Sequence, residues 1–269
     1  MEQSLQKNSP LKSLFATLTI PVIIAVCVVI YMFVLGNPAN FQGNDPANHP
    51  LPGNYLGIVY KGGFIVPILM SLFVMVITFS IERFITIAKA SGKGNTDGFL
   101  FKIRGLLLSN SIDQAISECD AQKGSLGNVV KSGLKKYKAM QSDKELSKDQ
   151  KVLAIQKDIE EATELELPAL EQNLVIIATI ASIATLFGLL GTVLGMIKAF
   201  AALAQAGAPD SIALANGISE ALINTALGIS ASALAIIAYN YFTTKIDKLT
   251  YSIDEAGFSV LQSYSSTQK

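Results

Sequence analysis

The chain has 269 residues, of which 50% are apolar and only 16% are charged, and its mean hydropathy is +0.42. About a quarter of the residues in a soluble domain are usually charged, so long stretches of this chain must lack charge. Its 21 basic residues balance its 21 acidic ones, which argues against a protein that binds nucleic acid by neutralising phosphates. Two distant cysteines, Cys27 and Cys119, and the single His49 exclude a disulfide framework and a zinc site with the usual ligands. This composition indicates a membrane protein.

Four apolar runs are long enough to cross a bilayer, which requires about 20 helical residues. The first run, Leu14 to Leu35, follows Lys7 and Lys12 and could therefore be a signal peptide. Its 22 residues exceed the usual apolar core of such a peptide, and no clear cleavage site follows, so a retained transmembrane helix is favoured. Pro21 and Pro67 are expected in the first turns of their helices, where a missing N–H costs least. The other three runs are residues 64–81, 174–206 and 212–242.

Lysine and arginine residues indicate which segments face the cytoplasm, because short cytoplasmic loops carry an excess of them. The first dozen residues hold two, the 36–63 loop holds one, residues 89–171 hold thirteen, and the tail from 243 holds three. This alternation predicts a cytoplasmic N-terminus, four crossings and a cytoplasmic C-terminus. The expected regions are an N-terminal helix with its outer loop (1–63), the second span (64–88), a cytoplasmic region (89–171), a transmembrane hairpin (172–245) and a cytoplasmic tail (246–269).

Residues 89–171 form the water-exposed part, because they hold 26 of the chain's 42 charges. Apolar residues recur there at helical spacing, from Phe99 to Cys119 and from Val129 to Met140. A third helix is expected to begin at Ser147 to Gln150 and to continue into the third span, giving one helix of about 50 residues that Pro168 can kink. The sequence thus predicts an all-α membrane protein with four transmembrane helices, a helical cytoplasmic region and long helices that extend into the cytoplasm.

The third and fourth spans are rich in small and hydroxylic residues, unlike the bulky first two. These residues are Gly188, Gly191, Thr192 and Gly195, followed by Gly217, Ala221, Thr225, Gly228 and Ser232. Small residues let membrane helices approach closely, because packing rather than exclusion of water drives their association. Tight packing therefore explains at least part of the pattern. A further hypothesis is that some of these positions line a narrow passage.

Two threonines and one glutamate in these spans are candidate functional residues. Thr192 and Thr225 lie about 15 and 17 residues from the expected hairpin tip, Gly207–Pro209, so a rise of 1.5 Å per residue places them at similar depth. A charge at bilayer depth costs about 2.5–3.5 kcal/mol on insertion scales, which makes Glu220 a functional candidate. The alternative is a purely structural pair of Glu220 with Lys198 near the outer interface. Lys198 can also snorkel to the membrane surface and so needs no function.

The sequence lacks the motifs of common enzyme classes. It contains no GxSxG, Walker loop or HExxH, so no enzyme activity, cofactor or metal is expected. A proton path needs a group that takes up and releases a proton, and the last two spans hold one carboxylate, no histidine and no aspartate. If the chain conducts protons, Glu220 either acts alone or a partner supplies the missing acid.

The later spans carry recognisable motifs. Residues 178–200 read ATIASIATLFGLLGTVLGMIKAF, residues 218–229 read ISEALINTALGI, residues 81–84 read IERF, and residues 160–174 read EEATELELPALEQNL. Together they closely resemble the MotA/TolQ/ExbB proton channel family, in its pore helix, its Glu-Ala-Leu motif, its exit motif and its acidic helix. The resemblance covers residues 64–250, and the FGLLGTVLGM run is more similar to ExbB and TolQ than to MotA.

The resemblance implies an inner-membrane pentamer whose last two helices surround a pore. That pore would hold the single transmembrane helices of a dimeric partner, ExbD, TolR or MotB, which supplies a protonatable Asp. The family's functional threonines and glutamate correspond here to Thr192, Thr225 and Glu220. The sequence departs from the family at Thr185, where Pro is common, and at Asn224, where a small apolar residue is usual, so both add polar groups to the expected proton pathway. Many ExbB and TolQ chains also have three spans rather than four.

The preferred hypothesis is an ExbB-like stator subunit that, with an ExbD-like partner and a TonB-like protein, uses the proton-motive force to energise outer-membrane transport. A TolQ-like subunit of the Tol-Pal envelope-maintenance system is the alternative within the family, and the sequence separates the two poorly. A non-conducting membrane scaffold and a stand-alone channel also stay open, although the lack of inverted repeats disfavours the channel. The expected location is the bacterial inner membrane.

Overall fold

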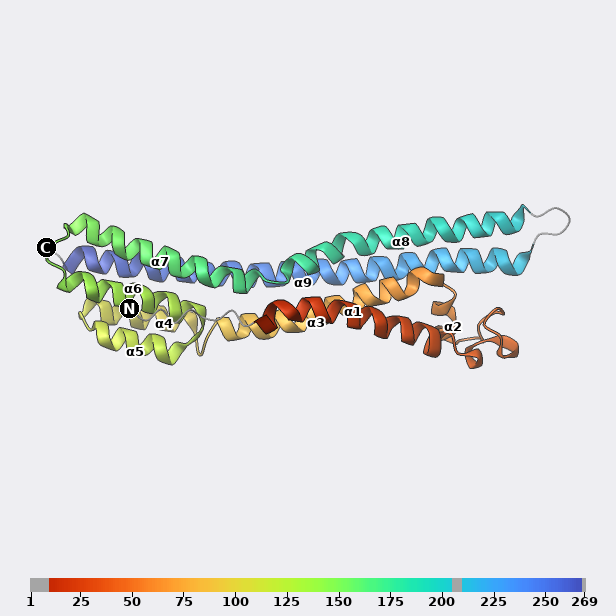
Figure 1. Ribbon diagram of the computed structural model, residues 1–269, viewed down its shortest axis with the longest axis horizontal. Coiled ribbons are helices and arrows are strands. Elements are labelled where there is room, and N and C mark those ends of the chain that lie inside the picture. Colours follow the sequence, from red (N-terminus) through yellow and green to blue (C-terminus); the bar gives the residue numbers. More distant parts are fainter. Residues whose placement is uncertain (1–9, 205–209, 268–269) are drawn as a thin grey trace. The chain divides into compact units, whose positions relative to one another are not determined.

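The computed structural model describes residues 10–204 and 210–267 and shows a protein built of α-helices (Figure 1). The helices are α1 (Pro10–Ile30), α2 (Tyr55–Tyr60), α3 (Val66–Ala90), α4 (Thr96–Leu108), α5 (Ile112–Gln122), α6 (Gly124–Ser142), α7 (Lys148–Glu171), α8 (Leu174–Leu203) and α9 (Ser211–Thr267). A π-helical turn (Tyr31–Leu35) continues α1, and the 3-10 turn Gly63–Ile65 leads into α3. No β-strand forms within the described ranges, so the predicted all-α class is confirmed.

Four helical segments are long and apolar enough to cross a membrane, as the sequence predicted. They are Phe15–Leu35, Gly63–Ala90, Lys148–Leu203 and Ser211–Ser266. Pro67 lies in the first turn of α3, as expected, but Pro21 lies inside α1, because that helix begins before the apolar run, at Pro10. Membrane helices tolerate an internal proline when neighbouring groups satisfy the freed backbone atoms. The expected hairpin tip at Gly207–Pro209 lies outside the described residues.

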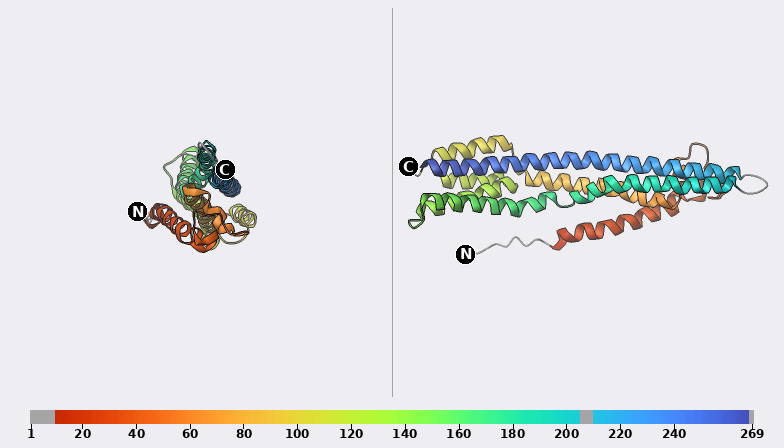
Figure 2. Two further views of the ribbon diagram at one scale, coloured as in Figure 1. Left: turned by 90° about the vertical axis from the view of Figure 1, so that its right-hand side faces the viewer. Right: turned by 90° about the horizontal axis from the view of Figure 1, so that it is seen from above.

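The chain divides into two compact units, and unit 1 comprises Met1–Ser80 and Val175–Tyr239. Within this unit α8 and the first part of α9 lie side by side in opposite directions, as Figures 1 and 2 show from different directions. Helix α1 packs against α3, where the rings of Phe15 and Phe79 meet edge to face with centroids 6.1 Å apart. The extra N-terminal span is therefore part of the packed unit.

The connection between the first two spans is held by hydrogen bonds and ring contacts. Asn40 Nδ2 donates to the last two carbonyl groups of the π-helical turn, at 2.8 and 3.0 Å, and so satisfies groups that a helix end leaves free. Tyr60 stacks on Tyr31 with ring centroids 4.8 Å apart, and Phe41 meets Tyr60 edge to face at 5.4 Å. These contacts fix the chain directly before residues 62–63, where the 3-10 turn that leads into α3 begins.

Unit 2 comprises Ile81–Leu174 and Asn240–Lys269 and has its own apolar core. The rings of Tyr137 on α6 and Tyr264 on α9 meet edge to face at 4.8 Å, and the Tyr264 hydroxyl donates to the Met140 carbonyl oxygen at 3.1 Å. Helix α7 begins after Ser147, whose side chain and that of Gln150 form a reciprocal capping box. The predicted start of this helix is confirmed.

Helix α9 continues far beyond the fourth span, to Thr267. The sequence predicts a cytoplasmic tail over residues 246–269, with no helix assigned to it. Buried apolar residues nevertheless continue there at helical spacing: Ile246, Leu249, Ile253, Ala256 and Val260. This spacing gives the C-terminal part of α9 an apolar face that belongs to the core of unit 2.

The single helix expected from Ser147 into the third span is interrupted at Gln172 and Asn173, so the prediction of one continuous helix is wrong. Asn173 has a φ of 65°, a left-handed conformation that asparagine tolerates better than most residues. Arg83, only 1% exposed, donates to two carbonyl groups in the last turn of α7, at 3.0 and 3.3 Å. Glu82 accepts hydrogen bonds from Arg83 and from Asn173 Nδ2. This junction satisfies the carbonyl groups that the end of α7 leaves free.

Candidate functional site

Thr192 on α8 and Thr225 on α9 form a direct hydroxyl pair. Their Oγ1 atoms are hydrogen-bonded to each other, which confirms the predicted similar depth of the two residues. Each hydroxyl also lies within hydrogen-bond distance of the carbonyl oxygen four residues earlier, at 3.1 Å for Thr192 and Gly188 and at 3.0 Å for Thr225 and Ala221. Because each hydroxyl carries one proton, one threonine donates to its carbonyl oxygen while the other donates to that threonine. The pair is therefore held in position by both helices and needs no other group to fix it.

The backbones of α8 and α9 touch around this pair, because glycine lies at the contact points. A Cβ atom on Gly195 would lie 2.6 Å from both the Gly217 carbonyl oxygen and the Ala221 nitrogen. A Cβ atom on Gly228 would lie 2.7 Å from a carbonyl oxygen of α8, and one on Gly188 would lie 3.1 Å from the Gly228 Cα. Any larger side chain would force the helices apart, as expected of small residues at a membrane helix interface.

Glu220 is buried, with 5% of its surface exposed, and is paired with Lys198. Lys198 Nζ donates to both Glu220 carboxylate oxygens at 2.7 Å. The Lys198 side chain remains 54% exposed, whereas the Glu220 side chain is 7% exposed. The pairing considered as the structural alternative thus forms, and Lys198 is engaged with the carboxylate rather than free to extend to the membrane surface.

The turn before α3 contacts the same part of α9. Gly63 has a φ of 75°, and a Cβ atom there would lie 2.6 Å from Glu220 Oε1. The carbonyl oxygen of Gly62 accepts a hydrogen bond of 2.7 Å from Asn224 Nδ2. Asn224 is fully buried, and its Oδ1 atom has no hydrogen-bond partner within the described residues. Asn224 therefore lies inside the unit, pressed against Gly191, where a Cβ atom would come within 2.3 Å of the asparagine Cβ.

The structure brings most of the predicted site residues into three separate contacts and leaves one of them apart. Thr192 joins Thr225, Glu220 joins Lys198, and Asn224 joins Gly62 and Gly191. Thr185 is half-buried on α8, about two helical turns before Thr192, and lies apart from these contacts.

The sequence offers the pair of Glu220 with Lys198 as one alternative, since their charges are opposite and lie at comparable distances from the end of the hairpin. The adjacent glycines Gly62 and Gly63, directly before a span, were not considered at all. A glycine pair at a helix entrance can mark a place where another backbone or side chain comes close.

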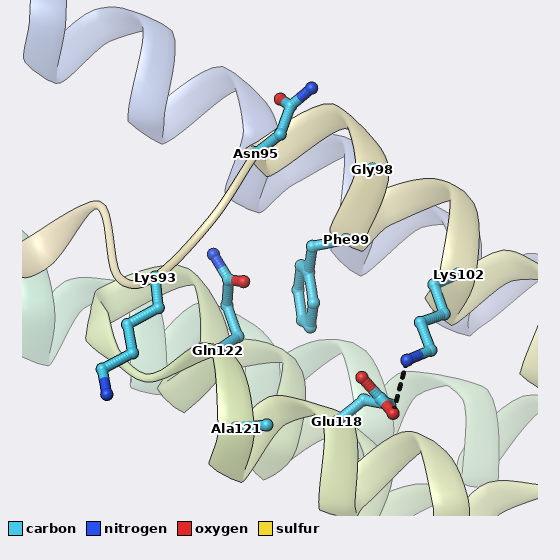
Figure 3. A pocket seen from close by; sticks show the side chains of 8 residues that line it. All are labelled: Lys93, Asn95, Gly98, Phe99, Lys102, Glu118, Ala121 and Gln122. Carbon is cyan, nitrogen blue, oxygen red and sulfur yellow. Dashed lines mark ion pairs between the residues drawn. The ribbon is translucent and has the colours of Figure 1, made fainter.

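Unit 2 contains a separate surface hollow of about 340 Å³ between α4 and α5 (Figure 3). The Phe99 ring lies between Gln122 and an ion pair formed by Lys102 and Glu118, whose charged atoms are 2.6 Å apart. Because this acid and this base neutralise each other, the hollow offers no unpaired couple for proton transfer. Among the described residues no three His, Cys, Asp or Glu side chains are grouped to hold a metal ion.

The sequence was compared with models of known protein families. Residues 121–255 match the model of the MotA/TolQ/ExbB proton channel family. The match covers half of the chain and includes the hydroxyl pair and the ion pair. The chain belongs to the MotA/TolQ/ExbB proton channel family. The name describes a proton channel, which agrees with the resemblance inferred from the sequence motifs.

Relatives in this family carry two different names. The chain is 32% identical over 145 residues to the Tol-Pal system protein TolQ of Pseudomonas aeruginosa, a match that covers 54% of this chain and 62% of the relative. It is 37% identical over 86 residues to the biopolymer transport protein ExbB of Pseudomonas putida, covering 32% of this chain and 26% of the relative. A third match, to ExbB of Salmonella typhimurium, is 35% identical over 85 residues and covers 32% of this chain and 35% of the relative. The chain thus spans less than two thirds of the length of each of these relatives, and the names leave TolQ and ExbB unresolved.

Proposed function

We propose that this chain is an ExbB-like proton-channel stator subunit of the bacterial inner membrane. With an ExbD-like partner it would use the proton-motive force to energise TonB-dependent transport across the outer membrane. The single observation that carries this proposal is the Thr192–Thr225 hydroxyl pair, which lies between two closely packed membrane helices inside the stretch that matches the family. Glu220 lies on α9 five residues before Thr225, so the only carboxylate of this part of α9 is close to the pair.

The side chains can pass a proton only if another titratable group completes the path. A threonine hydroxyl can donate and accept a hydrogen bond at once, but it does not hold a proton charge at ordinary pH. Glu220 can take up and release a proton, and the described parts of α8 and the 211–242 segment of α9 contain no aspartate or histidine. The proposal therefore assigns the second acid to an ExbD-like single-span partner, as a dimer inside a pentamer of this chain.

Two further polar residues belong to the proposed path. The unpartnered Oδ1 atom of Asn224 is a buried acceptor, and such atoms are usually satisfied by water or another group. Thr185 adds a hydroxyl two turns along α8. The exposed apolar side chains of α8 suit lipid or neighbouring copies, and include Leu186, Leu189, Val193 and Ile197.

The proposed topology places both termini in the cytoplasm and residues 36–63 on the outer side. Its support is the distribution of lysine and arginine, with thirteen such residues in 89–171 and one in the 36–63 loop. A cysteine introduced in the 36–63 loop and another in α4 should react with a membrane-impermeant reagent only from opposite sides of the membrane.

A TolQ-like role is the second candidate, and one observation favours it. The match to TolQ of Pseudomonas aeruginosa extends over 145 residues, whereas the ExbB matches extend over 85 to 86. Deletion of the gene separates the two roles: loss of uptake through TonB-dependent transporters supports the ExbB-like role, and sensitivity to detergents with defective division supports the TolQ-like role.

Proton flux into vesicles that contain the chain and its co-expressed partner tests the channel itself. Thr192→Val with Glu220→Ala should abolish partner-dependent flux, while the surface variant Lys248→Met should retain it. Unchanged flux in the double variant would refute the proposal. If the unmodified complex forms with its partner but shows no proton flux, the non-conducting scaffold is favoured. If the chain alone shows proton flux, the stand-alone channel is favoured.

A further inference from the structure

Lys198 pairs with Glu220, the buried carboxylate among the described residues of unit 1. Its ammonium group donates to both Glu220 carboxylate oxygens at 2.7 Å, so both oxygens are engaged by the lysine. The lysine side chain is 54% exposed, whereas the glutamate side chain is 7% exposed. The exposed end of this pair is therefore the lysine, and the carboxylate lies behind it.

The N-terminal part of the chain also lies against Glu220. Gly63 lies so close that a Cβ atom would come within 2.6 Å of Oε1 and 3.0 Å of Cδ. Tyr31, in the turn after α1, is within electrostatic range of the carboxylate, and its hydroxyl donates to the Tyr60 carbonyl oxygen at 3.2 Å. Lys61 lies two residues before Gly63 in the sequence, but its ammonium group donates to the carbonyl oxygens of Pro46 and Ala47. Among the described residues, Lys198 is thus the cation that pairs with Glu220.

We propose that Lys198 is a positioning residue that covers the Glu220 carboxylate and holds it in place, and that proton uptake by Glu220 releases it. This inference rests on the proposed function, in which Glu220 belongs to the proton pathway. The proton binds one carboxylate oxygen and gives a neutral carboxyl group, while Lys198 stays protonated throughout. Neutralising the carboxylate removes the attraction between the two groups, and the half-exposed lysine can then turn toward water or lipid headgroups.

The physical basis is the low polarity around a buried carboxylate. Burial by itself disfavours a charged carboxyl group, and a cation in contact favours it. An opposite charge within hydrogen-bond distance typically changes the protonated fraction of a carboxyl group by about tenfold or more at neutral pH. The charge at position 198, rather than the bulk of the side chain, should therefore decide how firmly the Glu220 carboxylate is held.

Carbodiimide labelling of Glu220 measures this directly, because dicyclohexylcarbodiimide reacts with protonated carboxyl groups in apolar surroundings. The full-length chain in membrane vesicles is treated at pH 7, and the modified peptide is quantified by mass spectrometry. Lys198→Met should raise the labelling rate of Glu220 by about tenfold, whereas Lys198→Arg should leave it near the unmodified rate. Lys248→Met, an exposed lysine replaced elsewhere on α9, should leave it unchanged. An unchanged rate in Lys198→Met would overturn the proposal.

A second variant removes any doubt about folding of Lys198→Met. Lys198→Cys can be modified after folding with a methanethiosulfonate reagent that adds either an aminoethyl group or a neutral methyl group. The native cysteines, Cys27 and Cys119, are both buried. Slow labelling of Glu220 after the aminoethyl reagent and fast labelling after the methyl reagent support the proposal, and equal rates overturn it.

Proton flux measured on the same preparations distinguishes failure of this inference from failure of the proposed function. If Glu220→Gln abolishes flux but Lys198→Met leaves Glu220 labelling unchanged, only the role of Lys198 is refuted. If Glu220→Gln leaves flux intact, Glu220 is outside the pathway and the role of Lys198 in proton passage is refuted with it.

Discussion

Replacement of Gly63 by alanine should destabilise the protein more than the same change at a glycine in open space. Gly63 has a φ of 75°, and its missing Cβ position lies 2.6 Å from Glu220 Oε1. Ordinary contact begins at 3.4 Å, so the oxygen would have to move by about 0.8 Å (3.4 minus 2.6). That movement would disturb the two hydrogen bonds of 2.7 Å from Lys198.

Gly53 provides a matched control for the backbone part of this effect. Its φ is 78°, nearly the same as that of Gly63, and nothing lies within 4 Å of its Cβ position. A left-handed alanine costs about 1–2 kcal/mol, and this is the whole cost expected for Gly53→Ala. Gly63→Ala should cost about 1–3 kcal/mol more, because a buried charged group loses well-aligned hydrogen bonds.

The free energies of unfolding can be compared in detergent with circular dichroism, since the chain has no tryptophan for fluorescence. The decisive experiment adds Glu220→Ala. With the carboxylate removed, Gly63→Ala should cost no more than Gly53→Ala, because contacting residues do not contribute additively. Equal costs for the two alanine variants in the unmodified background would show that the carboxylate does not lie against Gly63 and would refute the reasoning.

Three further predictions concern unit 2. Arg83→Met should lower the free energy of unfolding by about 3–5 kcal/mol, because it leaves Glu82 without its buried partner. Hydrogen exchange should also rise in residues 169–173, where Arg83 binds backbone carbonyl groups, and unchanged exchange there would contradict the junction described. Burial raises the pKa of the Cys119 thiol to about 12 from an ordinary 9.0. Only about one thiol in ten thousand is then ionised at pH 8, so iodoacetamide should modify Cys119 far more slowly in the folded protein than in denaturant. The sign of this shift also means that stability should fall as the pH rises above 9.0, since the unfolded thiol loses its proton first. Ser147→Ala should cost about 1 kcal/mol in chemical denaturation, whereas Ser147→Asp should cost little, because aspartate can also cap α7.

Hydropathy and local spacing were sufficient to predict the four spans, the all-α class and the start of α7. These features depend on neighbouring residues along the chain, so a sequence pattern carries them directly. The similar depth of Thr192 and Thr225 also followed from counting, because two helices joined by a short hairpin have a register set by residue number, whereas their direct hydrogen bond did not.

Contacts between distant parts of the chain could not be obtained in this way. Gly62 and Asn224 are 162 positions apart, and nothing in the local pattern around either indicates the other. The break after α7 was missed for the same reason, because Arg83, which bonds the freed carbonyl groups, is 87 positions from Leu170. The sequence alone left open whether Lys198 pairs with Glu220, because snorkelling also explains a lysine near a span end without reference to the facing helix.

The glycine contact between α8 and α9 has a mechanical consequence. Gly188 and Gly195 of α8 meet the main chain of α9, and Gly191 between them meets the Asn224 side chain. Sliding by one turn, about 5.4 Å, would bring larger side chains to these points and separate the helices. These contacts therefore favour one register of α8 against α9, in which a movement of one helix would carry the other with it.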